Sequence, residues 1–492
     1  MGKLKVIKKL TEFKLDPNKV TKYHIAIVTC VLLLVSFMIN IDHNPDIYFM
    51  MNHGRYILNN GFTSIEPFTV HEGLAFSFEK WLSCIIFYKL HEWFGMAGID
   101  ILSYICTTIM FFVLYKLLNY IGKNEKVSLI FICIAGPIYC FLFLSKRPSM
   151  FSNLIFILEI FCLEKFVRER NWKYLCWLPV LSCILMNLHS TIFPVFFILA
   201  LPYFALNTKL FCIGKPRYPV KNKYDFTMAC QLILGLGFSA MALLLNPFHV
   251  NSIYYTINSL AVDIWSVEIT ELAPLSIKST QLLYILPLIL LHLFYLFYNK
   301  KLTPIRYLLL FYLTLGMGFS AIRNLQFFLL CSLPLLVFEY SNAKFSEKLR
   351  SFGLESFFIF AIATLFIFCL LSSANTFGKE NFNNIPTGDM PEGSKVYCDF
   401  NTGSYLEWKG YKTYMDGRVE LFFEPINGKE DIIMEYVRSR HGIVSLDALQ
   451  YRYDFDYYLV PKLSALNTAI IERTDWNLID STDKYDLWEV IR

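Results

Sequence analysis

Long apolar runs separated by short polar connections make up most of the chain between residues 23 and 374. A typical run of roughly 17 to 21 residues is long enough for one α-helix to cross a hydrocarbon core of about 30 Å. Because a helix satisfies its own backbone hydrogen bonds inside a membrane, we interpret each run as a transmembrane helix. The expected spans are 23–41, 98–121, 127–144, 149–165, 174–187, 190–207, 226–245, 281–298, 304–321, 324–340 and 354–374.

A further apolar segment, 79–95, is short and contains several ionisable residues, so it does not suit a lipid-facing span. We interpret it as an amphipathic helix in the outer membrane interface, with Trp81 and Trp93 at headgroup depth. The count is then about eleven spans, with 11 to 13 as its range. The basic connections, among them residues 1–22, then fall on one side, which predicts a cytoplasmic N-terminus. The loops expected outside are 42–97, 145–148, 187–190 and 246–280.

After about residue 376 the chain changes to short alternating runs with turn signals at 416–417 and 427–428. Runs at 395–400, 411–415, 455–460 and 476–480 predict strands, and 432–440 and 465–473 predict helices. The predicted fold class is therefore an α-helical polytopic membrane protein with a small exoplasmic α/β domain. Its expected parts are a cytoplasmic basic N-terminus (1–22), a transmembrane domain (23–375) whose outer loop 42–97 carries two interfacial helices, and the α/β domain (376–492).

Composition agrees with the membrane interpretation and excludes some functions. Of the 492 residues 55% are hydrophobic and 17% charged, whereas soluble proteins carry about 25% charged residues. The net charge of +5 is spread over the loops, which argues against a nucleic-acid partner. Nearly all of the 13 cysteines lie in or beside apolar runs, so the sequence predicts no disulfide framework.

The first outer loop gathers ionisable residues beside the first span, which an apolar chain has little reason to do unless the loop is functional. Pro45 suits the first turn of a helix, and Asp46 suits the positive N-terminal end of that helix. In a helix from Pro45 to Leu58, Asp46 and His53 share one face. Two interpretations remain open: Asp46 is a capping charge, or it is a general base at the membrane surface.

Other polar residues recur where spans meet the outer face. They are Lys146-Arg147-Pro148, Asn187, His189, Glu268, Glu271 and Arg323. Positive charge on the outer side opposes the usual bias. Arg147 and Arg323 are therefore either structural residues that snorkel or ligands of an anion, and a phosphate at headgroup depth suits a guanidinium. The sequence contains no metal-ligand spacing, glycine-rich phosphate loop or nucleophile elbow.

Short motifs follow one another along nearly the whole chain. The first loop has Asp46, Gly54-Arg55, Gly61 and Pro67-Phe68-Thr69; then come Glu79 with Trp81-Leu82, Trp93-Phe94-Gly95, Arg147-Pro148, Asn187 with His189, Glu271-Leu272 with Pro274, Gly403 to Trp408, and Asp416 to Leu421. In this order they resemble the GT-C superfamily of multi-pass glycosyltransferases, which use polyprenyl-phosphate sugars. The resemblance is strongest to an uncharacterised bacterial branch of that superfamily.

The resemblance implies roles for the polar residues. Asp46 would be the catalytic base, with Asp42 as the fallback. The donor phosphate and lipid would be bound by Lys80, Arg147, His189 and Arg323, and the supporting or acceptor-binding residues would be Asp42, His53, Arg55, Glu79 and Glu271. Many relatives carry a second acidic residue where this chain has Lys146-Arg147-Pro148, which disfavours a metal bridged by two carboxylates. No cofactor is implied, and the question of a divalent metal stays open.

The implied function is an inverting glycosyl transfer on the outer face of a bacterial plasma membrane. A hexosyl or pentosyl group would pass from an undecaprenyl-phosphate-linked donor to a cell-envelope acceptor, which is a polysaccharide, a teichoic acid, a glycolipid or a protein. The expected partners are the donor, the acceptor and the lipid bilayer. The alternatives are a transporter or flippase of lipid-linked saccharides, because charges inside a membrane mark such pathways, and a non-catalytic component of a polysaccharide assembly pathway.

Overall fold

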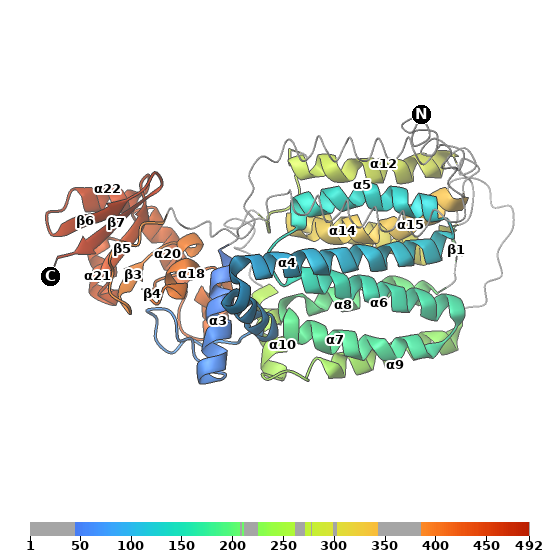
Figure 1. Ribbon diagram of the computed structural model, residues 1–492, viewed down its shortest axis with the longest axis horizontal. Helices are drawn as coiled ribbons and strands as arrows, with labels where there is room; N and C mark the ends of the chain where they lie inside the picture. Colours follow the sequence, from blue (N-terminus) through green and yellow to red (C-terminus); the bar gives the residue numbers. More distant parts are fainter. Residues whose placement is uncertain are drawn as a thin grey trace, which may run out of the picture.

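The computed structural model describes residues 45–206, 209–210, 225–260, 271–276, 278–298, 303–342 and 385–491. Residues 1–22, the expected spans 23–41 and 354–374, and the side chains of Asp42 and Glu268 lie outside the described residues. Figure 1 shows a bundle of helices running side by side along the long axis of the molecule. The C-terminal strands and helices lie beyond one end of this bundle, and the short helix α3 lies at the junction.

Helix α3 (Asp46–Asn60) forms where the first outer loop predicts a helix, and it ends two residues later than expected. Pro45 precedes it, and Gly61 stops it by adopting a positive φ of 80°. Most of α3 is buried, from Ile47 to Gly54, because it packs against α4 on one side and the C-terminal region on the other. The loop helix is therefore part of the hydrophobic core.

Helix α4 (Trp81–Gly122) combines the predicted interfacial helix 79–95 with the predicted span 98–121. Its two halves meet at Gly95, whose φ of 61° and ψ of −158° are not helical. Glycine adopts this conformation without the steric penalty that a Cβ would bring. The half before Gly95 packs with α3 at the end of the bundle, and the half after it runs along the bundle (Figure 1).

The bundle continues with further apolar helices packed around one core that includes Leu114, Ile160, Leu185 and Leu336. They are α5 (Glu125–Phe143), α6 (Ser149–Glu169), α7 (Trp177–Leu188), α8 (Phe193–Ala200), α9 (Phe226–Ala242), α12 (Thr280–Tyr298), α13 (Ile305–Ser320), α14 (Leu325–Cys331) and α15 (Leu333–Asn342). The structure confirms helices at 127–144, 149–165, 226–245, 281–298 and 304–321.

Two other expected spans, 190–207 and 324–340, are helical but divided into shorter segments, and the stretch 322–341 is still long and apolar enough to cross a bilayer. The first consists of η2 (Ser190–Ile192), α8 and η3 (Leu201–Ala205), and the second of η4 (Ile322–Asn324), α14 and α15. Pro194, Pro202 and Pro334 each lie within the first two residues of a new segment. Proline lacks the N–H group that a continuing helix needs, so the geometry changes at these points. The span 174–187 likewise begins as a 3₁₀ turn, η1 (Trp172–Cys176), before α7.

The chain is a membrane protein in composition and in structure. Among the described residues, three helical stretches are long and apolar enough to cross a bilayer, at 81–122, 280–297 and 322–341. Shorter apolar helices at 127–143, 172–188, 190–205, 226–242 and 305–320 lie beside them. The exact number of spans, and which end of the bundle faces the cytoplasm, stay predictions.

The loops expected outside meet at the end of the bundle that carries α3. Ser190 donates its N–H to the Glu79 carbonyl at 3.2 Å, and the Ser103 hydroxyl donates to the Ser145 carbonyl at 3.2 Å. Helix α10 (Val250–Leu260), which the sequence did not predict, packs at the same end. Basic connections meet at the opposite end, where Arg168 binds the Tyr120 carbonyl and strand β1 (Lys209–Leu210) pairs with β2 (Thr303–Pro304).

The C-terminal region forms a five-stranded sheet in the order β4-β3-β5-β7-β6. Its strands are β3 (Lys395–Tyr397), β4 (Lys412–Thr413), β5 (Tyr457–Pro461), β6 (Trp476–Ser481) and β7 (Tyr485–Val490), and β3 pairs in parallel with β4 and β5. The helices around it are α18 (Phe400–Trp408), η5 (Val419–Phe422), α19 (Glu424–Asn427), α20 (Ile432–Arg440), α21 (Leu446–Tyr453) and α22 (Ala465–Ile471).

Most of the strands and helices expected in this region are confirmed, with one correction. The strand expected at 395–400 stops at Tyr397, because the Asp399 side chain accepts hydrogen bonds from the N–H groups of Asn401 and Thr402 and begins α18 instead. Strand β7 and helices α18 and α21 were not predicted.

Candidate active site

Asp46 is the first residue of α3, at the junction of the bundle and the C-terminal region. Its carboxylate Oδ2 lies 3.2 Å from Nη2 of Arg147, and 28% of its side chain stays exposed. Gly417 of the C-terminal region closes one side, since a Cβ there would lie only 2.9 Å from Asp46 Oδ1. The Asp46 carboxylate therefore faces both parts of the molecule.

Arg147 lies in the short loop between α5 and α6 and contacts two carboxylates. Besides Asp46 it binds Glu271, with 2.7 Å between Nη1 and Oε2. The Glu271 carbonyl in turn accepts the N–H of Arg323 at 2.9 Å. Four segments that are far apart in sequence, around residues 46, 147, 271 and 323, therefore meet at one place.

The surroundings change the acidity of Asp46. Burial raises the pKa of its carboxyl above the ordinary 3.8, and Arg147 and Lys80 counteract part of that rise. A carboxylate with a raised pKa is a stronger base than an ordinary aspartate. The raised pKa and the position of the carboxylate therefore suit a group that accepts a proton.

Lys80 and His189 approach the same centre from other segments. Lys80 caps α4, and its ammonium lies 5.7 Å from the centroid of the Phe49 ring. His189 follows α7, and its Nδ1 lies 3.1 Å from the Ser152 hydroxyl. Burial lowers the pKa of His189 well below 6.5, and the nearby charges of Lys80, Arg323 and Arg147 lower it further. His189 is therefore a neutral imidazole that can form hydrogen bonds, and it adds no positive charge to the site.

Glu79 is buried beside a second carboxyl, Glu420 of η5, which was absent from the predicted site. Burial raises the pKa of Glu79 to about 8, Glu420 raises it as well, and Lys80 and the Thr256 hydroxyl oppose the rise. Burial also raises the pKa of Glu420, and Asp46 and Asp416 contribute to that rise while Lys80 lowers it. Glu420 is the second acidic residue of the Asp416 to Leu421 motif, so the sequence had singled out the segment that contains it.

We predict that Glu79→Gln flattens the dependence of stability on pH. Because its pKa is 4.5 in the unfolded chain and about 8 in the folded protein, the folded protein binds more protons between these values. The free energy of unfolding therefore falls as the pH rises from 4.5 to about 8. In thermal unfolding scans across this range, the midpoint of the variant should fall less than that of the wild type. Glu472→Gln, at an exposed position, is the control, and parallel curves for the wild type and Glu79→Gln would contradict the assignment.

Two predicted supporting residues point away from this centre. His53 is buried among the rings of Phe49, Phe68, Phe76 and Phe78 at centroid distances of 5.1 to 5.3 Å. Its pKa is lowered well below 6.5 by burial, with contributions from Arg418 and Lys80. Arg55 stacks on Trp408 at 4.6 Å and donates to the Trp408 carbonyl at 3.2 Å. Both side chains hold α3 against its neighbours.

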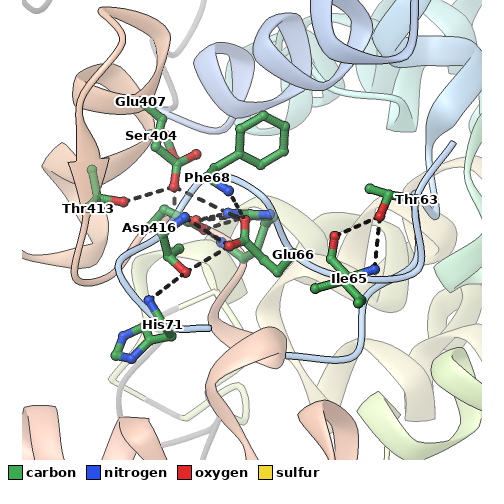
Figure 2. A network of polar contacts seen from close by, with 12 residues as sticks. Thr63, Ile65, Glu66, Phe68, His71, Ser404, Glu407, Thr413 and Asp416 are labelled. Carbon is green, nitrogen blue, oxygen red and sulfur yellow. Dashed lines mark hydrogen bonds and ion pairs between the residues drawn. The ribbon is translucent and has the colours of Figure 1, made fainter. Parts of the chain in front are cut away.

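A buried ion cluster joins the first outer loop to the C-terminal region (Figure 2). The Arg418 guanidinium contacts three carboxylates: Glu66 at 2.9 Å, Glu407 at 3.2 Å, and Asp416. Glu66 also accepts the N–H groups of Phe68 at 2.9 Å and Thr69 at 2.8 Å. We refer to Glu66, Glu407, Asp416 and Arg418 as the interlock.

Backbone contacts extend the interlock along the loop. Val70 donates its N–H to the Thr413 carbonyl at 2.9 Å, and His71 Nε2 lies 2.8 Å from the Tyr414 carbonyl. The Pro67-Phe68-Thr69 and Asp416-Gly417-Arg418 motifs therefore meet in space. Because Gly417 lies between two interlock residues and contacts Asp46, the interlock also sets the wall of the candidate site.

The carboxylates near Asp46 do not fit a divalent metal ion. Asp46 and Glu271 approach one another, but the Arg147 guanidinium lies between them and forms an ion pair with each. A cation bridging the two carboxylates would have to displace a group of the same sign. Elsewhere in the described part of the chain, no group of three or more His, Cys, Asp or Glu side chains is arranged to hold a metal.

No protein-family model and no curated protein matches this sequence. The structure is similar to the crystal structure of the Archaeoglobus fulgidus oligosaccharyltransferase tethered through a disulfide bond to an acceptor peptide containing the NVT sequon. The TM-score is 0.51 at 10% sequence identity, over 89% of this chain and 69% of that chain. At this identity the likeness concerns the fold. The fold is thus similar to that of an oligosaccharyltransferase, which agrees with the expected GT-C resemblance, and the long apolar helices are those of a membrane protein.

Proposed function

We propose that this protein is an inverting glycosyltransferase that moves a sugar from a polyprenyl-phosphate-linked donor to an acceptor hydroxyl or amide. Its fold is that of an enzyme named for transferring oligosaccharides. The observation that carries the proposal is the cluster at the α3 end of the bundle. There the Asp46 carboxylate, of raised pKa, lies within 3.2 Å of Arg147 and close to Lys80, with Arg323 and His189 beside them.

The chemistry follows from the charges of this cluster. Asp46 takes the proton of the acceptor while the acceptor oxygen or nitrogen forms a bond to the anomeric carbon of the donor. The bond between that carbon and the phosphate oxygen breaks, and its electron pair leaves with the polyprenyl phosphate. Attack from the face opposite the phosphate inverts the anomeric configuration. General base catalysis of this kind contributes about 10²- to 10⁴-fold to a rate.

The leaving phosphate gains negative charge, so fixed cations beside it lower the barrier. Arg323 is exposed at the turn between α13 and α14, and Lys80 and Arg147 act on the same centre. We assign the phosphate to these three side chains, and to His189 a neutral hydrogen bond. Glu79 and Glu420, which both lie near Lys80, would contact the acceptor.

We place the site on the outer face of a bacterial plasma membrane, with undecaprenyl phosphate as the carrier lipid and a cell-envelope acceptor. Lys/Arg-rich connections at the bundle end away from α3 support this orientation, because such connections stay in the cytoplasm.

The test is transfer by the purified protein in lipid nanodiscs. Undecaprenyl-phosphate-linked hexoses and pentoses are supplied one at a time with envelope extract as acceptor, and mass spectrometry follows the release of undecaprenyl phosphate and the glycosylated product. Covalent transfer from one of these donors is the expected result. If sealed vesicles move the intact lipid-linked sugar across the bilayer and no product forms, the protein is a transporter and the proposal is wrong.

Arg323→Ala should weaken the binding of undecaprenyl phosphate about 10- to 100-fold, the loss expected for one charge-assisted hydrogen bond. Binding is measured by native mass spectrometry in nanodiscs without any sugar donor. The control is Arg452→Ala, since Arg452 pairs with Glu430 and Glu435 on the surface of the C-terminal region. Equal binding by Arg323→Ala and the wild type would remove Arg323 from the phosphate site.

A further inference from the structure

The loop between α5 and α6 holds a guanidinium at the point where two carboxylates converge. Asp46 comes from the start of α3 and Glu271 from a loop more than 200 residues later, and both contact Arg147, at 3.2 and 2.7 Å. Each carboxylate contacts a different nitrogen of the guanidinium, Nη2 for Asp46 and Nη1 for Glu271. Two acidic side chains that meet from separate segments would otherwise repel one another or collect a divalent cation.

Contacts of the two preceding residues, Ser145 and Lys146, hold Arg147 in this position. Lys146 is fully buried and pairs with Asp100 of α4 at 3.1 Å, and the two side chains are 1% and 0% exposed. The Ser145 carbonyl accepts a hydrogen bond from Ser103, one turn further along α4. Pro148 directly after Arg147 restricts the backbone and starts α6. The loop can therefore move little relative to α4.

We infer that Arg147 is a resident cation, which takes the place that a divalent metal would have between Asp46 and Glu271, and that the site works without a bound metal. A guanidinium suits this task because it keeps its charge at every physiological pH and spreads it over a planar group that can bind two carboxylates at once. The inference rests on the proposed function for its catalytic meaning, but its central claim concerns cation binding.

Removing the guanidinium should convert the site into a metal site. In Arg147→Asp three carboxylates would face one point, which is the oxygen-rich environment that Mn²⁺ and Ca²⁺ prefer. We expect this variant to bind one Mn²⁺ with a dissociation constant on the order of 10⁻⁴ to 10⁻³ M, seen by electron paramagnetic resonance titration and by a Mn²⁺-dependent rise in the unfolding midpoint. Adding Asp46→Asn to Arg147→Asp should abolish both signals. The wild type should show neither.

Several outcomes would overturn the inference. One is a Mn²⁺ site in the wild type that disappears in Asp46→Asn. Another is a folded Arg147→Asp variant that binds no Mn²⁺, because the two carboxylates would then not face a common point. If Arg147→Asp does not fold, the wild-type titration and the milder Arg147→Ser, with a weaker Mn²⁺ site expected, still decide the question. The metal titration needs no turnover, so it separates a failure of this inference from a failure of the proposed glycosyl transfer. Where transfer is observed, its rate should not change in the presence of EDTA.

Discussion

Asp46→Asn is expected to lower the rate of sugar transfer about 10²- to 10⁴-fold, the contribution of a general base, with little change in the binding of undecaprenyl phosphate. The amide has nearly the same shape as the carboxylate but cannot accept the acceptor's proton. It can still accept a hydrogen bond from Arg147, whose pair with Glu271 also remains. The measurement is the initial rate of undecaprenyl phosphate release in nanodiscs, compared with the unfolding midpoint of each variant.

The control for this prediction is Asp447→Asn, because Asp447 is exposed and pairs with Arg473 in the C-terminal region. This variant should transfer sugar at the wild-type rate. The pH profile gives a second test. Arg147 lowers the pKa of Asp46, so in Arg147→Gln the acidic limb of the rate profile should move to higher pH. Full activity of Asp46→Asn would show that another group takes the proton.

Arg418→Met is expected to destabilise the contact between the first outer loop and the C-terminal region by about 3–5 kcal/mol, the usual loss when one partner of a buried ion pair is removed. Glu66, Glu407 and Asp416 would then face one another without a cation. Thermal unfolding and limited proteolysis of the C-terminal region measure the effect. Arg473→Ala, at an exposed pair, should cost about 0–1 kcal/mol.

The destabilisation should depend on pH with a definite sign. At present burial and the neighbouring Asp416 hold the pKa of Glu407 well above 4.5. At Asp416 burial raises the pKa, but the charge of Arg418 and hydrogen bonds with Arg418 and Glu407 together keep it below 3.8. Without Arg418 the carboxylates become neutral by taking up protons, so the loss of stability should be smaller at acidic pH. Adding Glu66→Gln and Asp416→Asn to Arg418→Met should restore part of the stability at neutral pH. A loss that does not vary with pH would contradict this account.

The rate of sugar transfer should also be lower in Arg418→Met, because the interlock sets the position of Gly417 beside Asp46. The C-terminal region therefore contributes directly to the candidate site. It supplies one wall of the candidate site through Gly417 and a second acidic group through Glu420.

Local features of the sequence were sufficient to predict most helices of the bundle. Apolar runs predicted α5, α6, α9, α12 and α13, and proline with an acidic residue predicted the start of α3. These features act within one helix, through burial and through the end charges of that helix, so they can be read from neighbouring residues. The same reasoning missed α10, and it extended one strand through Asp399, where a capping side chain began a helix instead.

The sequence also identified Asp46, Arg147, His189, Glu271 and Arg323 as polar residues at the ends of apolar runs, but it could not say which of them touch. Only the tertiary structure decided that Arg147 bridges Asp46 and Glu271, that His189 is a neutral group beside Ser152, and that His53 and Arg55 support α3. It alone brought Glu66 to Arg418, which is more than 350 residues away. A charged residue that is to be buried needs a partner, because desolvation makes an unpaired buried charge too costly to keep. Which residue becomes that partner depends on how distant segments pack together.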